Sequence, residues 1–281
     1  MHENRIRITW YGTASVRITA GESQLLIDPF FPFPESRVRV DAEAFAGCSR
    51  ILVSHGHFDH INSIPALVRR DTQIFCTNAP YRSLCRMGTA ESHLHRIRVG
   101  DTFSAGDFRI TVIKGNHSRL GAGDILKTLC SKRVIQNRKG LRKKLRMIAA
   151  CREKHETICY LIEIYGRRIL VLGSLALDAD TTYPEGADLA LFPYQGFGSL
   201  CQIAEDICKQ LRPRAVLLTH FDDTFPPFSS DVDTAGFAAS VKQYTAVYQL
   251  EHGGTLLLGS DGICRLASDT AKAEADHENN H

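Results

Sequence analysis

A cluster of three histidines and one aspartate constrains this chain more than any other feature. His55, His57, Asp59 and His60 fall within six consecutive positions, directly after the apolar run 51–53. A strand cannot bury so many ionisable groups without partners, so the cluster is expected on the loop that leaves a strand. Imidazole nitrogens and carboxylate oxygens are ligands that divalent transition metals prefer. The cluster therefore predicts a metal site, and a chance gathering of solvated histidines is the alternative.

The composition is that of an ordinary globular protein with a sizeable core. The 281 residues are 43% hydrophobic and 23% charged. No apolar run approaches the roughly 18 residues of a membrane helix, and residues 1–5 show no signal-peptide core, so a cytoplasmic location is the default expectation. Nine irregularly spaced cysteines form no C-x-x-C pair, which argues against a zinc ribbon or a disulfide framework.

Positive charge is concentrated in one segment. Residues 119–154 hold twelve Lys and Arg against Asp124 and Glu153, a local balance of +10, and the net charge of +3 then leaves −7 for the remainder. Because the segment follows His117 closely, it is expected to overhang the metal site as a lid, and a solvated helix pair is the alternative. The functional interpretations are recognition of a small anionic substrate, peripheral contact with a membrane, or nucleic-acid binding. The segment lacks aromatic residues for base stacking, which makes nucleic acid the least favoured partner.

Helical spacing predicts two helices in this basic segment, over residues 128–135 and 141–151. The second helix is expected to have an apolar stripe of Leu141, Leu145, Ile148 and Ala149 and a separate basic face of Arg142, Lys143, Lys144 and Arg146.

Alternating apolar residues and turn signals predict a chain of two strand-rich halves. The predicted strands are 5–9, 15–19, 24–28, 51–53, 73–76, 96–99, 102–103, 108–113, 157–164, 168–172, 189–192, 215–219, 246–250 and 255–258, and the other predicted helices are 62–70, 79–86, 199–210 and 234–243. Helices inserted between strands in both halves favour an α/β fold of two mixed sheets packed face to face. Residues 1–267 are expected to form one domain with a basic helical insertion at about 119–155, and residues 268–281 a disordered tail.

Three more polar groups follow predicted strands: His117, the pair Gly173-Ser174, and His220. Together with HGHFDH they resemble the metallo-β-lactamase superfamily, whose motif H-x-H-x-D-H precedes a distant His, a Gly-Asp and a final His. The stretches ITWYGTASVRIT, LLIDPF and PRAVLLTHFDDTF are similar to the branch with the L-ascorbate-6-phosphate lactonases and the N-acyl-phosphatidylethanolamine phospholipases. The resemblance spans roughly residues 6–258 and implies an αββα sandwich with outer helices.

The resemblance also implies two metal positions. One would be held by His55, His57 and His117, and the other by Asp59, His60 and His220. Zinc is the expected metal, as one or two ions, with manganese or iron as alternatives.

The position of the bridging carboxylate departs from the family pattern. The family joins its two metals through the Asp of Gly-Asp, and Ser174 stands there in this chain. A neutral hydroxyl is a much poorer ligand than a carboxylate, so the second position is expected to be weaker or to hold a different metal. Asp178 or Asp180 would have to reach back four to six residues to replace the missing ligand.

The expected function is metal-dependent hydrolysis of a small anionic ester, lactone or phosphoester. A bound cation lowers the pKa of water towards about 7 and polarises the scissile bond. Asp59 is the expected catalytic residue, which orients the water and later passes its proton to the leaving group. Asp28 and Asp222 are expected to fix the histidine tautomers. The alternatives are a degenerate binding protein with little turnover, marked by Ser174, and an RNA-processing nuclease.

Other polar positions receive separate interpretations. Thr13 stands where relatives often read W-x-G-H, so it is expected to alter substrate handling, whereas Trp10 is expected in the core. His93 and His95 are expected at the surface, and His252 in a hairpin turn. Asp223, next to Asp222, is interpreted either as a secondary metal contact or as part of an exposed loop.

Overall fold

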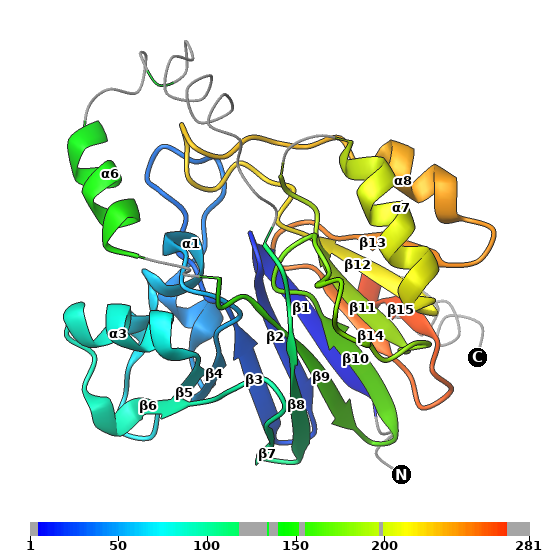
Figure 1. Ribbon diagram of the computed structural model, residues 1–281, viewed down its shortest axis with the longest axis horizontal. Helices are drawn as coiled ribbons and strands as arrows, with labels where there is room; N and C mark the ends of the chain where they lie inside the picture. Colours follow the sequence, from blue (N-terminus) through cyan, green and yellow to red (C-terminus); the bar gives the residue numbers. More distant parts are fainter. Residues whose placement is uncertain (1–4, 118–133, 135–139, 152–154, 197–198, 269–281) are drawn as a thin grey trace, which may run out of the picture.

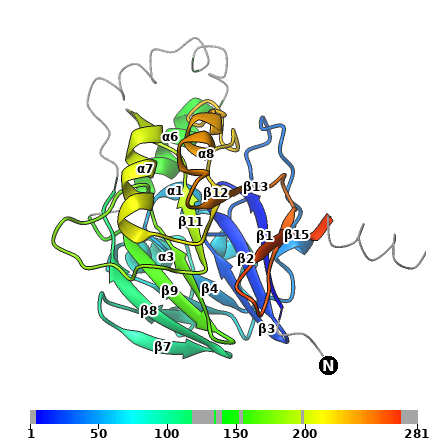
Figure 2. The ribbon, with the colours of Figure 1, turned by 90° about the vertical axis from the view of Figure 1, so that its right-hand side faces the viewer.

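The computed structural model describes residues 5–117, 134, 140–151, 155–196 and 199–268. Within these ranges two β-sheets pack face to face and helices lie on both outer sides (Figure 1, Figure 2). The expected αββα sandwich is confirmed. The predicted helix over 128–135, apart from Val134, and the predicted tail beyond Ser268 lie outside the described residues.

The first sheet contains eight strands in the order β15-β14-β1-β2-β3-β4-β5-β6. Its strands are β1 (Ile6–Gly12), β2 (Ser15–Ala20), β3 (Ser23–Ile27), β4 (Arg50–Leu52), β5 (Gln73–Cys76), β6 (Leu94–Arg96), β14 (Thr255–Leu258) and β15 (Cys264–Leu266). The first three strands form the expected antiparallel meander. From β3 to β6 the strands run parallel, so their carboxyl ends share one edge of the sheet, and the His/Asp cluster leaves β4 at that edge.

The second sheet contains seven strands in the order β13-β12-β11-β10-β9-β8-β7. Its strands are β7 (Thr102–Ala105), β8 (Phe108–Lys114), β9 (Ile158–Ile164), β10 (Arg167–Val171), β11 (Leu189–Pro193), β12 (Ala215–Thr219) and β13 (Ala246–Gln249). Because β9 is antiparallel to both β8 and β10, and β10 to β12 are parallel, the strands β8, β10 and β12 point the same way. His117, Gly173-Ser174 and His220 therefore emerge at a common edge.

The main core lies between the sheets. In β1, buried Ile6, Ile8 and Trp10 alternate with more exposed residues, and they meet residues such as Ile110 and Val112 of β8. This alternation is the pattern of strands that bury one face, and each large aliphatic side chain contributes roughly 1.5–3 kcal/mol. The predicted core role of Trp10 is confirmed, because its side chain is fully buried.

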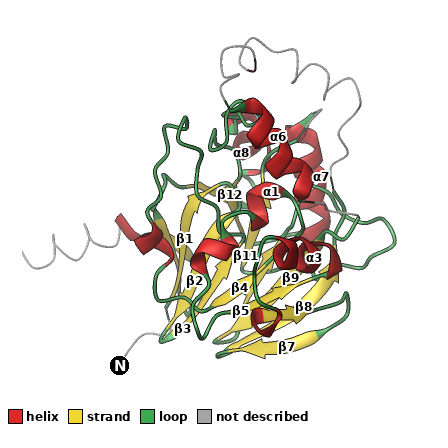
Figure 3. Ribbon diagram, turned by 90° about the vertical axis from the view of Figure 1, so that its left-hand side faces the viewer, coloured by secondary structure: helices red, strands yellow, loops and turns green. Residues whose placement is uncertain are grey.

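Helices cover both outer faces of the sandwich. They are α1 (Phe58–Ile61), α2 (Ile64–Leu67), α3 (Asn78–Arg86), α6 (Leu141–Ala150), α7 (Leu200–Leu211) and α8 (Ala235–Val241), with 3₁₀ turns at Ala42–Phe45 and Glu91–His93. The helices α7 and α8 pack on the second sheet (Figure 2), and α1 and α3 pack on the first (Figure 3). In the described part of the chain, every helix is too short or too polar to cross a bilayer.

The helix predicted over residues 62–70 is wrong in its extent. Within this range the structure has the short helix α2, and a separate short helix, α1, precedes it and begins inside the HGHFDH motif. Phe58 and Ile61, three residues apart, are both buried in the core under the first sheet, which favours a helical turn at this point. Asp59 and His60 consequently project from a helix rather than from a loop.

The strand predicted over residues 96–99 is also displaced, since β6 covers Leu94–Arg96. Leu94 is buried and pairs with Ile74 in the parallel ladder, which sets the register of this edge strand. The alternation of Ile97 and Val99 that suggested the later strand reflects a single buried side chain, because Val99 is 52% exposed.

The helix predicted over residues 141–151 is confirmed as α6, but its predicted orientation is wrong. The inward stripe consists of Lys144, Met147, Ile148 and Cys151, whereas Leu145 is exposed. The Nζ of Lys144 lies 2.9 Å from Glu35 Oε1, donates to the carbonyl of Pro226 at 3.1 Å, and sits 4.7 Å from the centre of the Phe33 ring. These partners compensate the loss of water around the buried ammonium group.

Lys144→Ala is expected to lower the free energy of unfolding by about 1–3 kcal/mol, because it removes the cation that joins α6 to Glu35 and to the carbonyl of Pro226. The matched control is Lys143→Ala on the same helix, where the side chain is exposed and the expected change is below about 0.5 kcal/mol. Urea denaturation of both variants measures the difference. Equal midpoints would show that the buried lysine contributes nothing to stability.

Candidate metal centre

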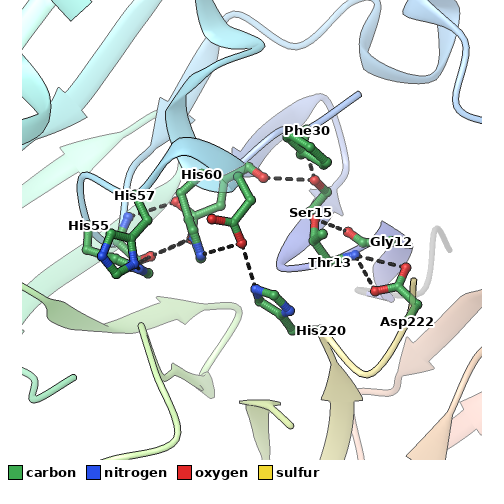
Figure 4. Close-up of polar contacts among 12 residues, drawn as sticks. Gly12, Thr13, Ser15, Phe30, His55, His57, His60, His220 and Asp222 are labelled. Atoms are coloured by element: carbon green, nitrogen blue, oxygen red, sulfur yellow. Dashed lines mark hydrogen bonds and ion pairs between the residues drawn. The ribbon is translucent and has the colours of Figure 1, made fainter. Parts of the chain in front are cut away.

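Six polar side chains from both sheets converge at one edge of the sandwich. The four members of the HGHFDH cluster follow β4 of the first sheet, and His117 and His220 follow β8 and β12 of the second. Figure 4 shows His55, His57, His60 and His220 turned towards one region. The ligand atoms of His55, His57 and His117 lie within 4.8 Å of one another, and so do those of Asp59, His60 and His220. The structure thus assembles the two sets that the resemblance implies.

The three-histidine group has the spacing of a metal site. His55 Nε2 and His57 Nδ1 are 3.1 Å apart, and the His117 ring lies 4.5 Å from that of His57. Two nitrogens at about 2.0–2.1 Å from a tetrahedral zinc ion would be about 3.3 Å apart, close to the observed separation. Burial, followed by the neighbouring histidines, lowers the pKa of His55 well below its ordinary value. His55 is therefore neutral near pH 7, the form that binds a metal.

The second group combines one carboxylate with two imidazoles. Asp59 Oδ2 lies 2.8 Å from His220 Nε2 and 3.5 Å from His60 Nε2. Burial acts to raise the pKa of Asp59, but the charge of His60 and the hydrogen bond from His220 lower it below its ordinary value. The ionised carboxylate can accept either a proton or a cation. His220 Nδ1 is buried and has no hydrogen-bond partner among the described residues. Most buried polar atoms have such a partner, so this nitrogen is an exception.

A second carboxylate fixes the orientation of His60. Asp28 Oδ2 lies 2.8 Å from His60 Nδ1, and Asp28 also accepts the backbone N–H and the hydroxyl of Ser54. Burial acts to lower the pKa of His60, but Asp28 and Asp59 together raise it. With its Nδ1–H donated to Asp28, His60 presents Nε2 towards Asp59, the arrangement that orients a metal-binding histidine. The expected role of Asp28 is confirmed, and the role of Ser54 was not predicted.

The end of β10 is pressed against the cluster. A Cβ at Gly173 would lie 2.3 Å from the Ile158 carbonyl oxygen and 3.2 Å from Ser54 Cβ, so only glycine fits there. Ser174 follows it and is buried. In the described part of the chain, both groups of ligand atoms leave out residue 174, and Asp59 is their one carboxylate.

The proposed replacements for the bridging carboxylate are held elsewhere. Asp178 accepts hydrogen bonds from Lys114 at 2.8 Å and Thr181 at 2.9 Å, and these bonds lower its pKa. Asp180 is exposed. Neither belongs to the two groups of ligand atoms found among the described residues, so this structure does not support either as a substitute.

Two residues expected near the metal have different roles. Asp222 accepts the backbone N–H of Thr13 and contacts His252 Nε2 at 2.8 Å, so the prediction that it fixes a metal-binding histidine directly is wrong. Thr13 is fully buried and its hydroxyl donates to the carbonyl of Gly12, and its effect on substrate handling stays a prediction. His252 lies in a turn, but this turn joins β13 of the second sheet to β14 of the first, so the prediction of a hairpin is wrong. Its contact with Asp222 was not predicted from the sequence.

The remaining polar candidates lie apart from the two groups. His93 is half-buried and its Nδ1 contacts the carbonyl oxygen of Thr72, while exposed His95 stacks on Phe75. Asp223 accepts a hydrogen bond from Ser229 within its own loop. The prediction of surface positions is therefore confirmed for His95 and holds only in part for His93.

Comparison with known proteins agrees with this geometry. A match to the family described as the beta-lactamase superfamily domain covers residues 23–221. The chain belongs to the beta-lactamase superfamily. Among curated relatives, a protein of Methylobacterium nodulans named UPF0173 metal-dependent hydrolase is 33% identical over 118 residues, which are 40% of this chain and 49% of the relative. The chain spans about half the length of the curated relatives it matches.

Solved structures with this superfamily fold include proteins of different chemistry. A metallo hydrolase from Ignicoccus hospitalis has a TM-score of 0.62 at 19% identity and covers 90% of this chain and 98% of its own. CmlA, a diiron β-hydroxylase from Streptomyces venezuelae, has a TM-score of 0.57 at 13% identity and covers 92% of this chain and 55% of its own. At such identities the likeness shows the fold alone, so the reaction must be argued from the side chains.

Proposed function

We propose that the protein is a metal-dependent hydrolase of a small anionic ester, lactone or phosphoester. The observation that carries this proposal is the presence of two groups of ligand atoms at one edge of the sandwich. The atoms of each group lie within 4.8 Å of one another, and a buried carboxylate orients His60. A purely structural role is less favoured, because each buried titratable group would then need its own hydrogen-bond or ion-pair partner.

The proposed ligands form the two groups that the structure brings together. His55, His57 and His117 would hold one ion, and Asp59, His60 and His220 a second, weaker one. Three imidazoles favour zinc, and the carboxylate in the second set also suits manganese or iron. When bound, such a cation supplies Lewis acidity and an acidic water molecule.

The chain's own residues supply proton transfer and orientation. Asp28 keeps the Nδ1 proton of His60 engaged, so that His60 Nε2 faces the reaction site. The lowered pKa of Asp59 keeps its carboxylate ionised, the form that can bind a cation or orient the attacking water. In the proposed reaction Asp59 takes the proton of the attacking water and later donates it to the leaving oxygen.

The surroundings of the site favour an anionic substrate. The end of α6 lies beside α1, because Cys151 is buried in the same apolar cluster as Phe58 and Ile61. Burial and the nearby Asp59 raise the pKa of the Cys151 thiol to about 11. The helix carries exposed Arg142, Lys143 and Arg146, and it stands above α1 in Figure 1. Such charges raise the local concentration of anions. Half-buried Phe225, whose ring is 6.3 Å from that of His220, offers an apolar contact for a small substrate.

Metal analysis and a matched pair of chromogenic substrates test the proposal. We expect the purified protein to contain at least one transition-metal ion per chain and to lose hydrolysis on chelation, with recovery on adding Zn²⁺ or Mn²⁺. Turnover of bis(p-nitrophenyl) phosphate, an anion, should exceed that of neutral p-nitrophenyl butyrate in kcat/KM after subtraction of the uncatalysed rate. Metal-free protein, or hydrolysis that survives chelation, would contradict the proposal.

Ser174 favours one second candidate function, a degenerate member that binds metal or an anionic ligand with little turnover. The serine supplies no negative charge where the superfamily pattern has its bridging carboxylate, and nearby Asp178 is held by Lys114 and Thr181. This candidate predicts bound metal without hydrolysis of either chromogenic substrate. An RNA-processing nuclease remains less favoured, because residues 119–154 contain no aromatic side chain.

A further inference from the structure

A hydrogen-bonded chain connects His252 to the backbone of His220. His252 Nε2 lies 2.8 Å from Asp222 Oδ2. The Asp222 carboxylate accepts the Thr13 N–H at 2.9 and 3.1 Å (Figure 4). The Thr13 carbonyl in turn accepts the N–H of His220 at 2.7 Å and the Nε1–H of Trp10 at 2.8 Å. Three turns, after β1, β12 and β13, are thereby tied together.

Two of these residues have an unfavourable backbone conformation that the chain maintains. Thr13 has a φ of +43° and His220 a φ of +60°, in the left-handed region that costs a residue with a Cβ about 1–2 kcal/mol. Each of the two residues is held by a buried hydrogen bond to the segment of the other. Because the backbone of His220 sets the direction of its imidazole, the same bonds set where Nε2 points.

His252 is exposed, but its ring has a fixed apolar neighbour. The ring stacks on Trp10 with 4.6 Å between ring centres, and Trp10 also stacks on Phe221 at 4.7 Å. A Cβ at Gly12, where φ is +111°, would lie 2.9 Å from Asp222 Oδ2 and 3.2 Å from His252 Cδ2. The close approach of the carboxylate and the imidazole therefore depends on a glycine at position 12.

We infer that His252 is a positioning residue for His220, and that through Asp222 and Thr13 it sets the metal affinity of the position formed by Asp59, His60 and His220. This inference rests on the proposed function, which assigns metal to that position. Without a carboxylate from residue 174, the second ion depends on these three side chains. The orientation of His220 therefore has a larger effect on metal affinity than it would beside a bridging carboxylate. Residues that orient a ligand typically change metal affinity 10–100-fold when they are lost.

A pair of amide substitutions tests the inference. In His252→Gln the amide N–H occupies nearly the place of Nε2 and can still donate to Asp222, whereas in His252→Asn the shorter side chain cannot reach. Titration of the metal-free protein with Zn²⁺ by calorimetry, and with Co²⁺ by visible absorption, resolves the two positions. We expect His252→Asn to weaken the weaker position about 10–100-fold and to leave the stronger one within about twofold. His252→Gln should restore most of the loss.

The outcomes separate this inference from a general loss of stability. A merely structural role would lower the thermal midpoint of the metal-free protein and weaken both positions together, and that result would overturn the inference. So would unchanged affinities in His252→Asn, or equal defects in the Asn and Gln variants. If the parent protein binds no Zn²⁺ or Co²⁺, the proposed function fails and the inference fails with it. If the parent protein binds two ions and His252→Asn has no selective effect on the weaker position, the inference is wrong and the proposed function stands.

Discussion

His57→Ala is expected to remove tightly bound metal from the three-histidine position and to lower kcat/KM on the order of 10³-fold. His57 Nδ1 and His55 Nε2 are 3.1 Å apart, so the imidazole supplies one of only three nitrogens in its group. Two remaining histidines leave a site too weak to hold zinc at micromolar concentration, and the acidic water is lost with it. Metal content by atomic emission and steady-state hydrolysis of bis(p-nitrophenyl) phosphate measure the two effects.

His95→Ala provides a matched control for that substitution. His95 is an exposed histidine on β6 that stacks on Phe75 and belongs to neither group of ligand atoms. Its variant should keep the metal content and the kcat/KM of the parent within about twofold. Retention of full metal content and turnover in His57→Ala would contradict both the ligand assignment and the proposed hydrolysis.

Ser174→Asp is expected to tighten the binding of the second ion by about 10–100-fold. A carboxylate there would add a negative charge at a strand end that packs against Ser54, next to His55. At an effective dielectric of about 20, a unit charge at about 4 Å from a unit charge contributes roughly 4 kcal/mol before desolvation is subtracted. Gly173 fits only as glycine, so the backbone before residue 174 has little freedom to move the new side chain away. Calorimetric titration with Zn²⁺ measures the second affinity.

The same variant separates the two candidate functions. A large gain of hydrolysis from an inactive parent supports the degenerate binding protein, and little change in an active parent supports a working site adapted to serine. Ser174→Asn is the control, since it has nearly the shape of aspartate without the charge. Equal second-ion affinities in the Asp and Asn variants would show that charge at this position does not control the site.

The sequence predicted the convergence of the site because strand direction determines where strand ends lie. His117, Ser174 and His220 each follow an apolar strand, and the parallel direction of β8, β10 and β12 brings those ends to one edge. Asp28 was also identifiable, since it directly follows β3, which pairs with β4. The local sequence pattern was sufficient here because each of these residues directly follows an apolar strand whose end lies at the same edge.

Lys144 and His252 escaped prediction for a common physical reason. Each is a polar residue whose partners come from distant parts of the chain, such as Glu35 for Lys144 and Asp222 for His252. Helical periodicity assigns a lysine to the solvent face, and a histidine before two glycines to a turn, unless a buried partner is known. No local sequence pattern marks such pairs, so the partners of Lys144 and His252 could be identified only from the structure.

The division of the ligand groups between the sheets couples metal binding to the sandwich itself. One sheet contributes the HGHFDH cluster and the other contributes His117 and His220, so each proposed ion would cross-link the two layers. Binding energy at the edge then adds to the cohesion of the core between the layers, and the two are thermodynamically linked. Bound metal would accordingly raise the free energy of unfolding and offset part of the stability lost by substitutions at Ile8 or Val112, deep between the sheets. In this architecture the metal centre would act as a fastener for the hydrophobic interior.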